Sequence, residues 1–261
     1  MKKHQWAAFP YPDKKYQYAG AALKKGWGRL HKGDCEPYPE SAAGQDAWRA
    51  YHAGEFGKAV ELGLKAGGDA LNAANKAAMI YANYLEHDES RKLALFQEIA
   101  DRCEKQQAAE PENANAFYFQ AYALGRYSQG ISVAKALAEG LGGKIKSALT
   151  RAIELQPAHA DAHIALGTWH AEVIDKVGSL VGGLTYGAKK DVGADLLYRA
   201  LELNPDSAIA RVEAANGLVM MYGKAKMKDA ERLYAEAVEH DPADAMERLD
   251  VEMAKADSED D

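Results

Sequence analysis

Apolar side chains recur at intervals of three and four residues through most of the chain, which is the pattern of amphipathic helices. No alternation of apolar and polar positions is long enough to predict a β-strand. Three segments, 152–157, 200–205 and 237–242, end alike, and in each a proline stops the helix. With a weaker copy that ends at Pro111, these prolines are spaced by 46, 48 and 37 residues. The pattern therefore predicts an all-α fold built from repeated units.

The repeated units resemble tetratricopeptide repeats, which are helix-turn-helix units of about 34 residues. Leu166 and Gly167 fall on the Leu-Gly pair of the first helix of the repeat. Ala230, Tyr234 and Pro242 fall on the Ala, aromatic and Pro positions of the second helix. One helix pair cannot bury its apolar stripe alone, so consecutive pairs stack. The resemblance implies a right-handed helical-repeat solenoid of about five TPR-like pairs, at about 42–66, 69–108, 112–155, 159–203 and 207–240.

Two of these pairs are longer than the repeat, by 12 and 14 residues. The surplus lies in two apolar, glycine-rich insertions, 130–143 and 177–187. Insertions at the same point of successive repeats are expected at the same edge of a solenoid. The chain also resembles the regulator of microtubule dynamics proteins over 157–222. The resemblance rests on a Leu-Gly helix, an insertion that ends in Tyr186 and Gly187, and the segment 200–205.

The two ends of the chain differ from the repeats. Residues 1–40 carry seven of the 23 aromatic residues and four prolines, so we expect an extended aromatic, basic arm that packs on the solenoid as a cap. A short helix within this arm is expected only from Tyr18 to Leu30. We assign 41–245 to the solenoid and 246–261 to an acidic helix end followed by a disordered tail.

The net charge of −7 is unevenly distributed. Residues 1–32 have a balance of +7, residues 246–261 have −5, and the remainder therefore carries −9. An acidic body argues against nucleic-acid binding, and we expect the basic arm to lie along it. No apolar run is long enough to span a membrane. The first dozen residues hold no signal-peptide core, which predicts a cytoplasmic protein, or a periplasmic one if a signal has been removed.

Chemistry-bearing residues are few. His159, His163 and His170 occur near Glu172, but His163 and His170 are about 10.5 Å apart along a helix, too far to share one zinc ion. We therefore predict packing roles for these histidines, with ligand contact as the alternative, and no metal or other cofactor. Cys35 and Cys103 are expected to be free thiols, and acidic neighbours should raise the pKa of Cys35. No catalytic or phosphate-binding motif is present, so we predict that the chain is not an enzyme.

The concave groove is the predicted site of function. In tetratricopeptide repeats the first helix of each pair lines this groove, and the resemblance places two Tyr residues and one Arg of 112–155 there at spacings of four. The predicted binding residues, aligned by the prolines to within about one residue, are Tyr118, Tyr122, Arg126, Ile164, Thr168, Glu172, Val212 and Asn216. Core packing is the alternative role for each of them.

Two functions from different classes fit this groove. The favoured hypothesis is a non-enzymatic scaffold that binds a protein segment, either an amphipathic helix or an extended peptide. The alternative is a carrier of an apolar small molecule or lipid, in which the two glycine-rich insertions close the pocket. An open trough would favour the scaffold, and an enclosed cavity would favour the carrier.

Overall fold

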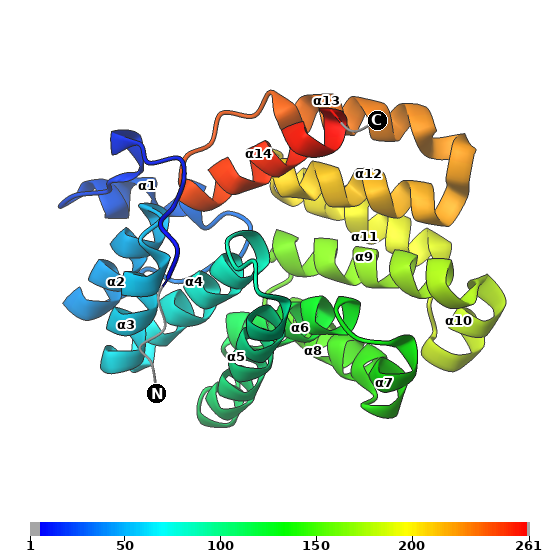
Figure 1. Cartoon of the computed structure of the whole chain (residues 1–261), viewed down its shortest axis with the longest axis horizontal. Helices are drawn as coiled ribbons and strands as arrows, with labels where there is room; N and C mark the ends of the chain where they lie inside the picture. The colour runs from blue at the N-terminus through cyan, green and yellow to red at the C-terminus, as the bar shows by residue number, and fades with distance from the viewer. Residues whose placement is uncertain (1–5, 260–261) are drawn as a thin grey trace.

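The computed structural model describes residues 6–259, and within them it contains helices and no strand (Figure 1). This confirms the prediction of an all-α fold. The five predicted pairs are present as α2 (Ala42–His52) with α3 (Phe56–Ala66), α4 (Leu71–Tyr84) with α5 (Glu89–Ala109), α6 (Ala114–Gln129) with α8 (Leu141–Leu155), α9 (Ala160–Val177) with α11 (Lys190–Leu203), and α12 (Ala208–Tyr222) with α13 (Met227–Val238). No helix in the described part is long and apolar enough to cross a bilayer.

The ends of the helices follow from local chemistry. Side chains of Ser41, Asp88, Asn113 and Ser207 each accept a hydrogen bond from a backbone N–H in the first turn of α2, α5, α6 and α12. Such N-caps satisfy donors that the helix itself leaves unpaired. At the other end, α5, α8 and α11 each end two residues before a proline, namely Pro111, Pro157 and Pro205. These prolines are therefore the boundaries between repeats that the sequence pattern indicates.

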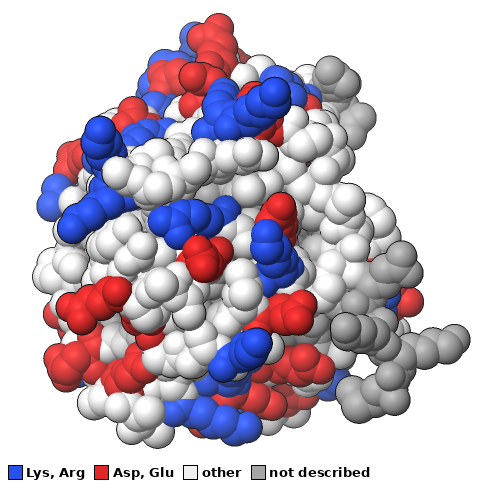
Figure 2. Space-filling view, turned by 90° about the vertical axis from the view of Figure 1, so that its left-hand side faces the viewer, with Lys and Arg blue, Asp and Glu red and all other residues white. Residues whose placement is uncertain are grey.

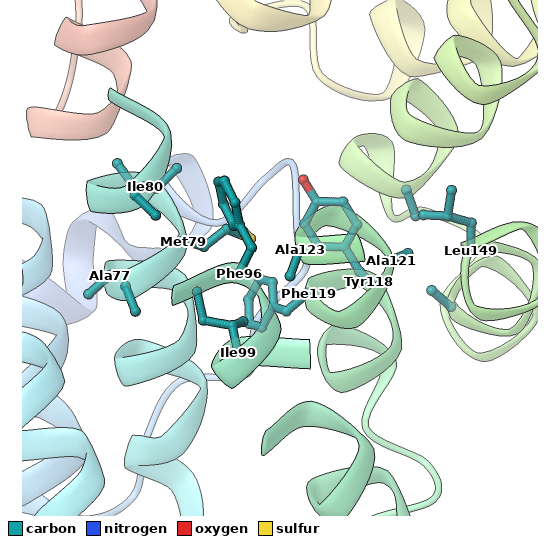
Figure 3. Packing of buried hydrophobic residues seen from close by; sticks show 14 of the residues in the cluster. Ala77, Met79, Ile80, Phe96, Ile99, Tyr118, Phe119, Ala121, Ala123 and Leu149 are labelled. Carbon is teal, nitrogen blue, oxygen red and sulfur yellow. The ribbon is translucent and has the colours of Figure 1, made fainter. Parts of the chain in front are cut away.

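Small residues allow the helices to cross closely. A Cβ on Gly167 of α9 would lie 2.7 Å from Leu197 Cγ of α11, so only glycine fits between these helices. Large apolar side chains fill the spaces beside such crossings. Figure 3 shows Phe96 and Ile99 of α5 packed against Phe119 of α6, and all three are buried. The core is therefore continuous from one helix pair to the next.

Both insertions fold into short helices, α7 (Val133–Ala138) and α10 (Ser179–Tyr186). Gly178 and Gly187 flank α10 with φ of +80° and +69°, a backbone conformation that favours glycine. The insertions meet, because a Cβ on Gly142 of the first would lie only 3.2 Å from Tyr186 Cε1 of the second. Lys146 Nζ of α8 donates a hydrogen bond to the Tyr186 carbonyl at 2.8 Å, and Trp169 Nε1 of α9 donates to the Gly142 carbonyl at 3.0 Å. They lie at the same edge of the molecule (Figure 1).

The amino-terminal arm lies against the first repeats. Its helix α1 (Ala22–Leu30) follows a 3-10 turn (Lys14–Tyr16), and Tyr16, Leu23 and Trp27 are buried. Trp27 Nε1 donates a hydrogen bond to the Glu36 carbonyl at 2.7 Å. Phe9 stacks edge-on against Phe56 of α3. Lys2 and Lys3, which contribute to the basic character of the arm, lie outside the described residues.

The carboxyl-terminal segment is an additional packed helix, α14 (Ala245–Glu259), and this differs from the expected acidic helix end and tail at 246–261. Leu249, Val251 and Ala254 are buried in the core. The acidic residues concealed this helix in the sequence, since Glu247 and Asp250 are themselves buried with partners. Residues 260 and 261 of the expected tail lie outside the described residues.

The two ends of the solenoid contact each other through α14 and the loop 239–244 that precedes it. Arg29 binds Glu247 with both guanidinium nitrogens, and Lys15 pairs with Asp241 at 2.8 Å. The basic arm thus pairs with acidic residues that follow the last repeat. Figure 2 shows basic and acidic side chains interleaved on the side of the molecule that carries the amino-terminal helices. Figure 1 shows the segment after α13 crossing to the first part of the chain beside α1, from where α14 runs back toward α12 and α13. The helical pairs therefore curve until the chain closes on itself.

Candidate functional site

The closed arrangement leaves a central cavity of about 240 Å³ on the concave side. It is lined by side chains of the first helices α4, α6, α9 and α12, and by α7, α8 and α14. Six of the eight residues predicted to bind line this cavity, namely Tyr118, Tyr122, Arg126, Ile164, Thr168 and Glu172. The spacing argument thus grouped residues of α6 and α9 that line the same cavity.

Val212 and Asn216 of α12 do not line the cavity. Val212 is buried against Ala208 and against Val251 of α14, and Asn216 Oδ1 accepts a hydrogen bond from the Tyr234 hydroxyl at 2.7 Å. Glu213, one residue further along α12, faces the cavity instead. The repeat alignment was displaced by about one residue, so the predicted positions on α12 face the neighbouring helices. The unexpected helix α14 also covers Val212.

One half of the cavity is apolar. The two insertions and the adjoining parts of α8 and α9 contribute this half, through Leu137, Leu141, Ile145, Trp169, Val173 and Tyr186. Gly125 of α6 also lines the cavity, and a Cβ built there would meet no atom within 4 Å. The wall beside Gly125 is therefore open space that a larger side chain or a ligand can fill.

The other half is polar and lies where α4, α6 and α14 approach one another. Tyr84, Tyr118 and Tyr122 line it with Asp250. Figure 3 shows the Tyr118 hydroxyl directed away from Phe119 and Ile99, which pack in the core. Burial raises the pKa of Asp250 to about 8, although the Tyr84 hydroxyl donates a hydrogen bond to its Oδ1 at 2.5 Å and opposes this shift. The Asp250 carboxyl is therefore largely protonated at neutral pH.

Arg126 joins three helices at the cavity wall. Its guanidinium group lies over the Tyr122 ring at 5.3 Å and pairs with Glu213 Oε1 of α12 at 3.1 Å. Glu213 Oε2 accepts a hydrogen bond from Thr168 of α9 at 3.2 Å. Glu172 accepts a hydrogen bond from Gln129 of α6 at 2.6 Å. These polar residues thus fix the relative positions of α6, α9 and α12.

A buried polar network lies at the amino-terminal end of the cavity. Asp34 Oδ2 accepts a hydrogen bond from Lys76 Nζ at 2.6 Å, and Asp34 Oδ1 lies 2.9 Å from His31 Nδ1. The His31 and His52 rings are hydrogen-bonded at 3.3 Å, and His52 contacts Asp244 at 2.7 Å. Burial alone would raise the pKa of Asp34, but Lys76 and His31 hold it well below its ordinary value. Asp34 and Lys76 therefore form a charged pair inside the protein.

Asp161, in the first turn of α9, differs from the other acidic residues of the cavity. Its backbone N–H donates to the Gly33 carbonyl at 3.0 Å, and its carboxylate lies so close to Gly33 that a Cβ there would collide with it. Among the described residues, no hydrogen bond or ion pair holds this carboxylate. Burial raises its pKa to about 6, Lys76 opposes the shift, and Asp34 adds to it. The cavity thus contains a carboxylate with free hydrogen-bonding capacity.

The three histidines have structural hydrogen bonds. His159 caps α9, because its Nδ1 accepts from the Ala162 N–H, while its Nε2 lies 2.9 Å from Asn115 Oδ1. His163 Nδ1 contacts the His159 carbonyl, and His170 Nδ1 accepts from the Lys189 N–H at 3.0 Å. Burial lowers the pKa of both His159 and His170 to about 4. Within residues 6–259, no three His, Cys, Asp or Glu side chains are placed to hold a metal ion.

The cysteine thiols are protonated at neutral pH. Burial raises the pKa of Cys35 to about 11, with further contributions from Asp34 and Asp161, and burial raises that of Cys103 to about 12. An acidic environment at Cys35 agrees with the sequence analysis, although burial is the larger cause. Neither thiol is activated as a nucleophile.

Several cavity residues were missed by sequence reasoning. Lys76 and Tyr84 lie on α4, in the part of the chain where the repeat pattern is weakest, and Asp250 lies in the segment assigned to the tail. The alternation of Leu249, Val251 and Ala254 with charged residues was the available signal for α14. Asp161 had a signal too, because it occupies a groove position of the repeat that includes Ile164 and Thr168.

Comparison with known proteins agrees with this architecture. A model of the regulator of microtubule dynamics protein 1-3 family matches residues 49–176, which lie further toward the amino terminus than the resembling segment 157–222 and overlap it at 157–176. A thermophilic TPR protein of Thermus thermophilus has a similar crystal structure, with a TM-score of 0.57 and 20% identity, covering 82% of this chain and 97% of that one. No curated protein matches the chain. The chain thus has a TPR-like helical-repeat fold and is similar over residues 49–176 to the regulator of microtubule dynamics proteins.

Proposed function

We propose that the chain is a non-enzymatic binding protein whose central cavity holds one small, elongated amphiphilic molecule. This is the carrier function that the sequence left as the alternative to a protein-binding scaffold. The apolar part of the ligand lies beside Leu141, Ile145 and Trp169, and its polar group lies near Tyr118 and Asp161. TPR-like folds commonly build binding surfaces rather than catalytic centres, and the fold is the general basis of the proposal.

The small size and partial enclosure of the cavity are the observation that favours a small ligand. The cavity has about 240 Å³, and α14 occupies much of the concave side. A helical segment of a partner therefore does not fit unless α14 moves, whereas a small molecule does.

The distribution of polar groups indicates the kind of ligand. Arg126 is paired with Glu213, Arg29 with Glu247, and Lys76 with Asp34, so these cations are already neutralised. The Asp161 carboxylate retains free acceptor capacity. A hydrogen-bond donor at the polar end of the ligand, such as an amine or a hydroxyl, is therefore the complementary group.

Filling the cavity tests the proposal. Gly125→Leu places a side chain in open space, so we expect the variant to fold and to lose ligand. The matched control is Gly28→Leu, in which the new side chain of α1 also meets no atom within 4 Å but lies on the surface. Native mass spectrometry with octylamine and octanol as probes should detect one bound molecule on the wild type and the control, and none on Gly125→Leu. Equal loading of all three proteins, or of none, would contradict the proposal.

A second candidate function is the binding of a protein helix in place of α14. The supporting observation is that α14 is itself a helix held on the concave side, through Tyr84 with Asp250 and His52 with Asp244. A partner helix could take its position only if α14 detaches while the repeats stay folded. Hydrogen exchange should then show α14 opening well before α4 and α6. Exchange of all these helices in one global event would exclude this mode.

A further inference from the structure

The most exposed large apolar side chains of the described residues all belong to the two insertions. Leu184 is 81% exposed, Leu180 76%, Val133 56%, Leu137 53% and Val181 51%. Single exposed apolar residues are common on protein surfaces, but a group concentrated on two neighbouring short helices indicates an interaction site. We call these five residues the insertion patch.

The local sequence of α10 explains why its apolar face points outward. Gly182 on the opposite face is buried, and a Cβ there would lie 3.2 Å from Val173 Cγ1, so the glycine face packs closely on α9. Leu180, Val181 and Leu184 fall on the outer face. Because Gly182 allows the helix to dock through its backbone, the large apolar side chains are not needed for folding and face solvent instead.

Basic residues surround the insertion patch, although the whole chain has a net charge of −7. The segment 130–151 contains Lys135, Lys144, Lys146 and Arg151 with one acidic residue, Glu139. The segment 175–191 contains Lys176, Lys189 and Lys190 between Asp175 and Asp191. Lys144 and Lys189 are exposed, and neither has an ion-pair partner among residues 6–259. Lys146 hydrogen-bonds to Tyr186, which joins the two basic segments. The patch is therefore apolar at its centre, and basic residues outnumber acidic ones in the two segments around it.

We propose that the insertion patch docks the protein on a lipid bilayer that contains anionic lipids. Leucine and valine side chains on one face of a short helix, flanked by lysines, are the chemistry that binds the bilayer interface without spanning it. A second copy of the chain fits less well, because five side chains are far fewer than the 20–30 residues that each partner contributes to a stable interface. This proposal goes beyond the cavity function and does not depend on it.

The position of the patch relates it to the cavity. Val133 and Leu137 line the cavity and are also more than half exposed, so they lie at its mouth. Docking through α7 and α10 would therefore bring the apolar half of the cavity against the bilayer. A ligand with an apolar part would then pass between the two without crossing water.

The test is flotation of the full-length chain with vesicles of phosphatidylcholine alone and of phosphatidylcholine mixed with phosphatidylglycerol. We expect binding to the mixed vesicles at low salt, weaker binding to phosphatidylcholine alone, and a decrease at high salt. The double variant Leu180→Gln/Leu184→Gln should bind at least roughly tenfold more weakly. Its matched control, Leu64→Gln/Met227→Gln, changes two exposed apolar residues of α3 and α13 and should bind like the wild type.

A second pair of variants tests the charge. Lys144→Glu/Lys189→Glu should lose the preference for anionic vesicles, whereas Lys25→Glu/Lys65→Glu, which alters the net charge equally at distant exposed sites, should keep it. Absence of vesicle binding by the wild type, or equal losses in the test and control variants, would overturn the proposal. So would light scattering that shows a wild-type dimer and a monomeric Leu180→Gln/Leu184→Gln variant, because a second copy would then cover the patch. Octylamine loading of these surface variants, which should match the wild type, tests the cavity function separately.

Discussion

Gly63 of α3 lies where this helix crosses the start of α4. A Cβ at this position would lie 2.5 Å from the Ala70 carbonyl oxygen and 2.7 Å from Ala74 Cβ, and the first of these is a backbone atom that cannot rotate away. We therefore expect Gly63→Ala to lower the free energy of unfolding by roughly 1–3 kcal/mol, measured by chemical denaturation. The control is Gly28→Ala in α1, where no atom lies within 4 Å. It should raise the free energy of unfolding by about 0.5–1 kcal/mol. A loss of stability in Gly28→Ala would show that steric contact at the Cβ position does not explain the effect of these substitutions.

Asp250 makes stability depend on pH. Its pKa is about 8 in the folded protein, whereas the ordinary pKa of an aspartate is 3.8, so between these values the folded state binds more protons than the unfolded state. The contribution of this group to stability is therefore greatest below pH 3.8, declines as the pH rises, and is lost above about pH 8. Within this window each pH unit costs up to about 1.4 kcal/mol.

Asp250→Asn should remove this dependence, since the amide oxygen can still accept a hydrogen bond from Tyr84. We expect the stability of the variant relative to the wild type to increase between pH 5 and pH 8, in urea unfolding at each pH. His31, His159 and His170, whose pKa values are lowered to about 4, add the opposite slope at acidic pH in both proteins and cancel in the comparison. A difference that stays constant with pH would contradict the prediction.

The sequence predicted individual site residues unevenly. Tyr118, Tyr122 and Arg126 were found because a spacing of four fixes one face of a helix, whatever the helix packs against. Lys76 and Asp250 could not be found in this way. Each is buried because of a partner from a distant part of the chain, Asp34 and Tyr84 respectively, and no local pattern records such a pairing.

At the scale of elements, α14 provides a clear test of burial. Leu249 is 5% exposed within the core, so Leu249→Ala should cost about 2–5 kcal/mol in the free energy of unfolding. In contrast, Ala256, Asp257 and Ser258 are exposed, and deletion of 256–261 should leave the melting temperature nearly unchanged. Calorimetry of the two variants distinguishes a packed helix from a tail. Similar melting temperatures for both would mean that α14 contributes little to the fold.

Helices were predicted well where the chain itself marks their ends. Pro111, Pro157 and Pro205 stop helices for a stereochemical reason that needs no tertiary context. The helix α14 does have a start marker, since Asp244 Oδ1 accepts a hydrogen bond from the Glu247 N–H at 2.9 Å, but its acidic residues resemble those of a solvated tail. The helices α7 and α10 within the insertions were also not predicted. They have only six and eight residues, and two of those in α10 are glycines, so neither shows helical periodicity.

For the whole molecule, the contact between the two ends should couple distant repeats. Arg29 and Glu247 form a two-point ion pair whose carboxylate is largely buried, with 10% of the Glu247 side chain exposed. A double-mutant cycle with Arg29→Ala and Glu247→Ala should give a coupling energy of about 1 kcal/mol or more. The exposed pair Arg232 and Glu236 of α13 is the control, and its coupling should be only about 0.3–0.5 kcal/mol. Equal couplings would indicate that the ends touch without stabilising each other.

The closure itself was beyond sequence reasoning. The repeats predict that helix pairs stack, but the overall curvature is the sum of small rotations at every pair. The insertions, the arm and α14 each alter that sum. The distinction between an open trough and an enclosed cavity therefore depended on the structure.

The meeting of α14 with the first helices also bears on how such a protein can evolve. Open solenoids gain or lose repeats by duplication and deletion, because each unit contacts only its neighbours. Here an added helix pair would rotate α14 away from Arg29, His52 and Tyr84 and leave their buried partners exposed. The number of repeats is then fixed by geometry, and the family of such closed chains can diversify only through its side chains and its two insertions.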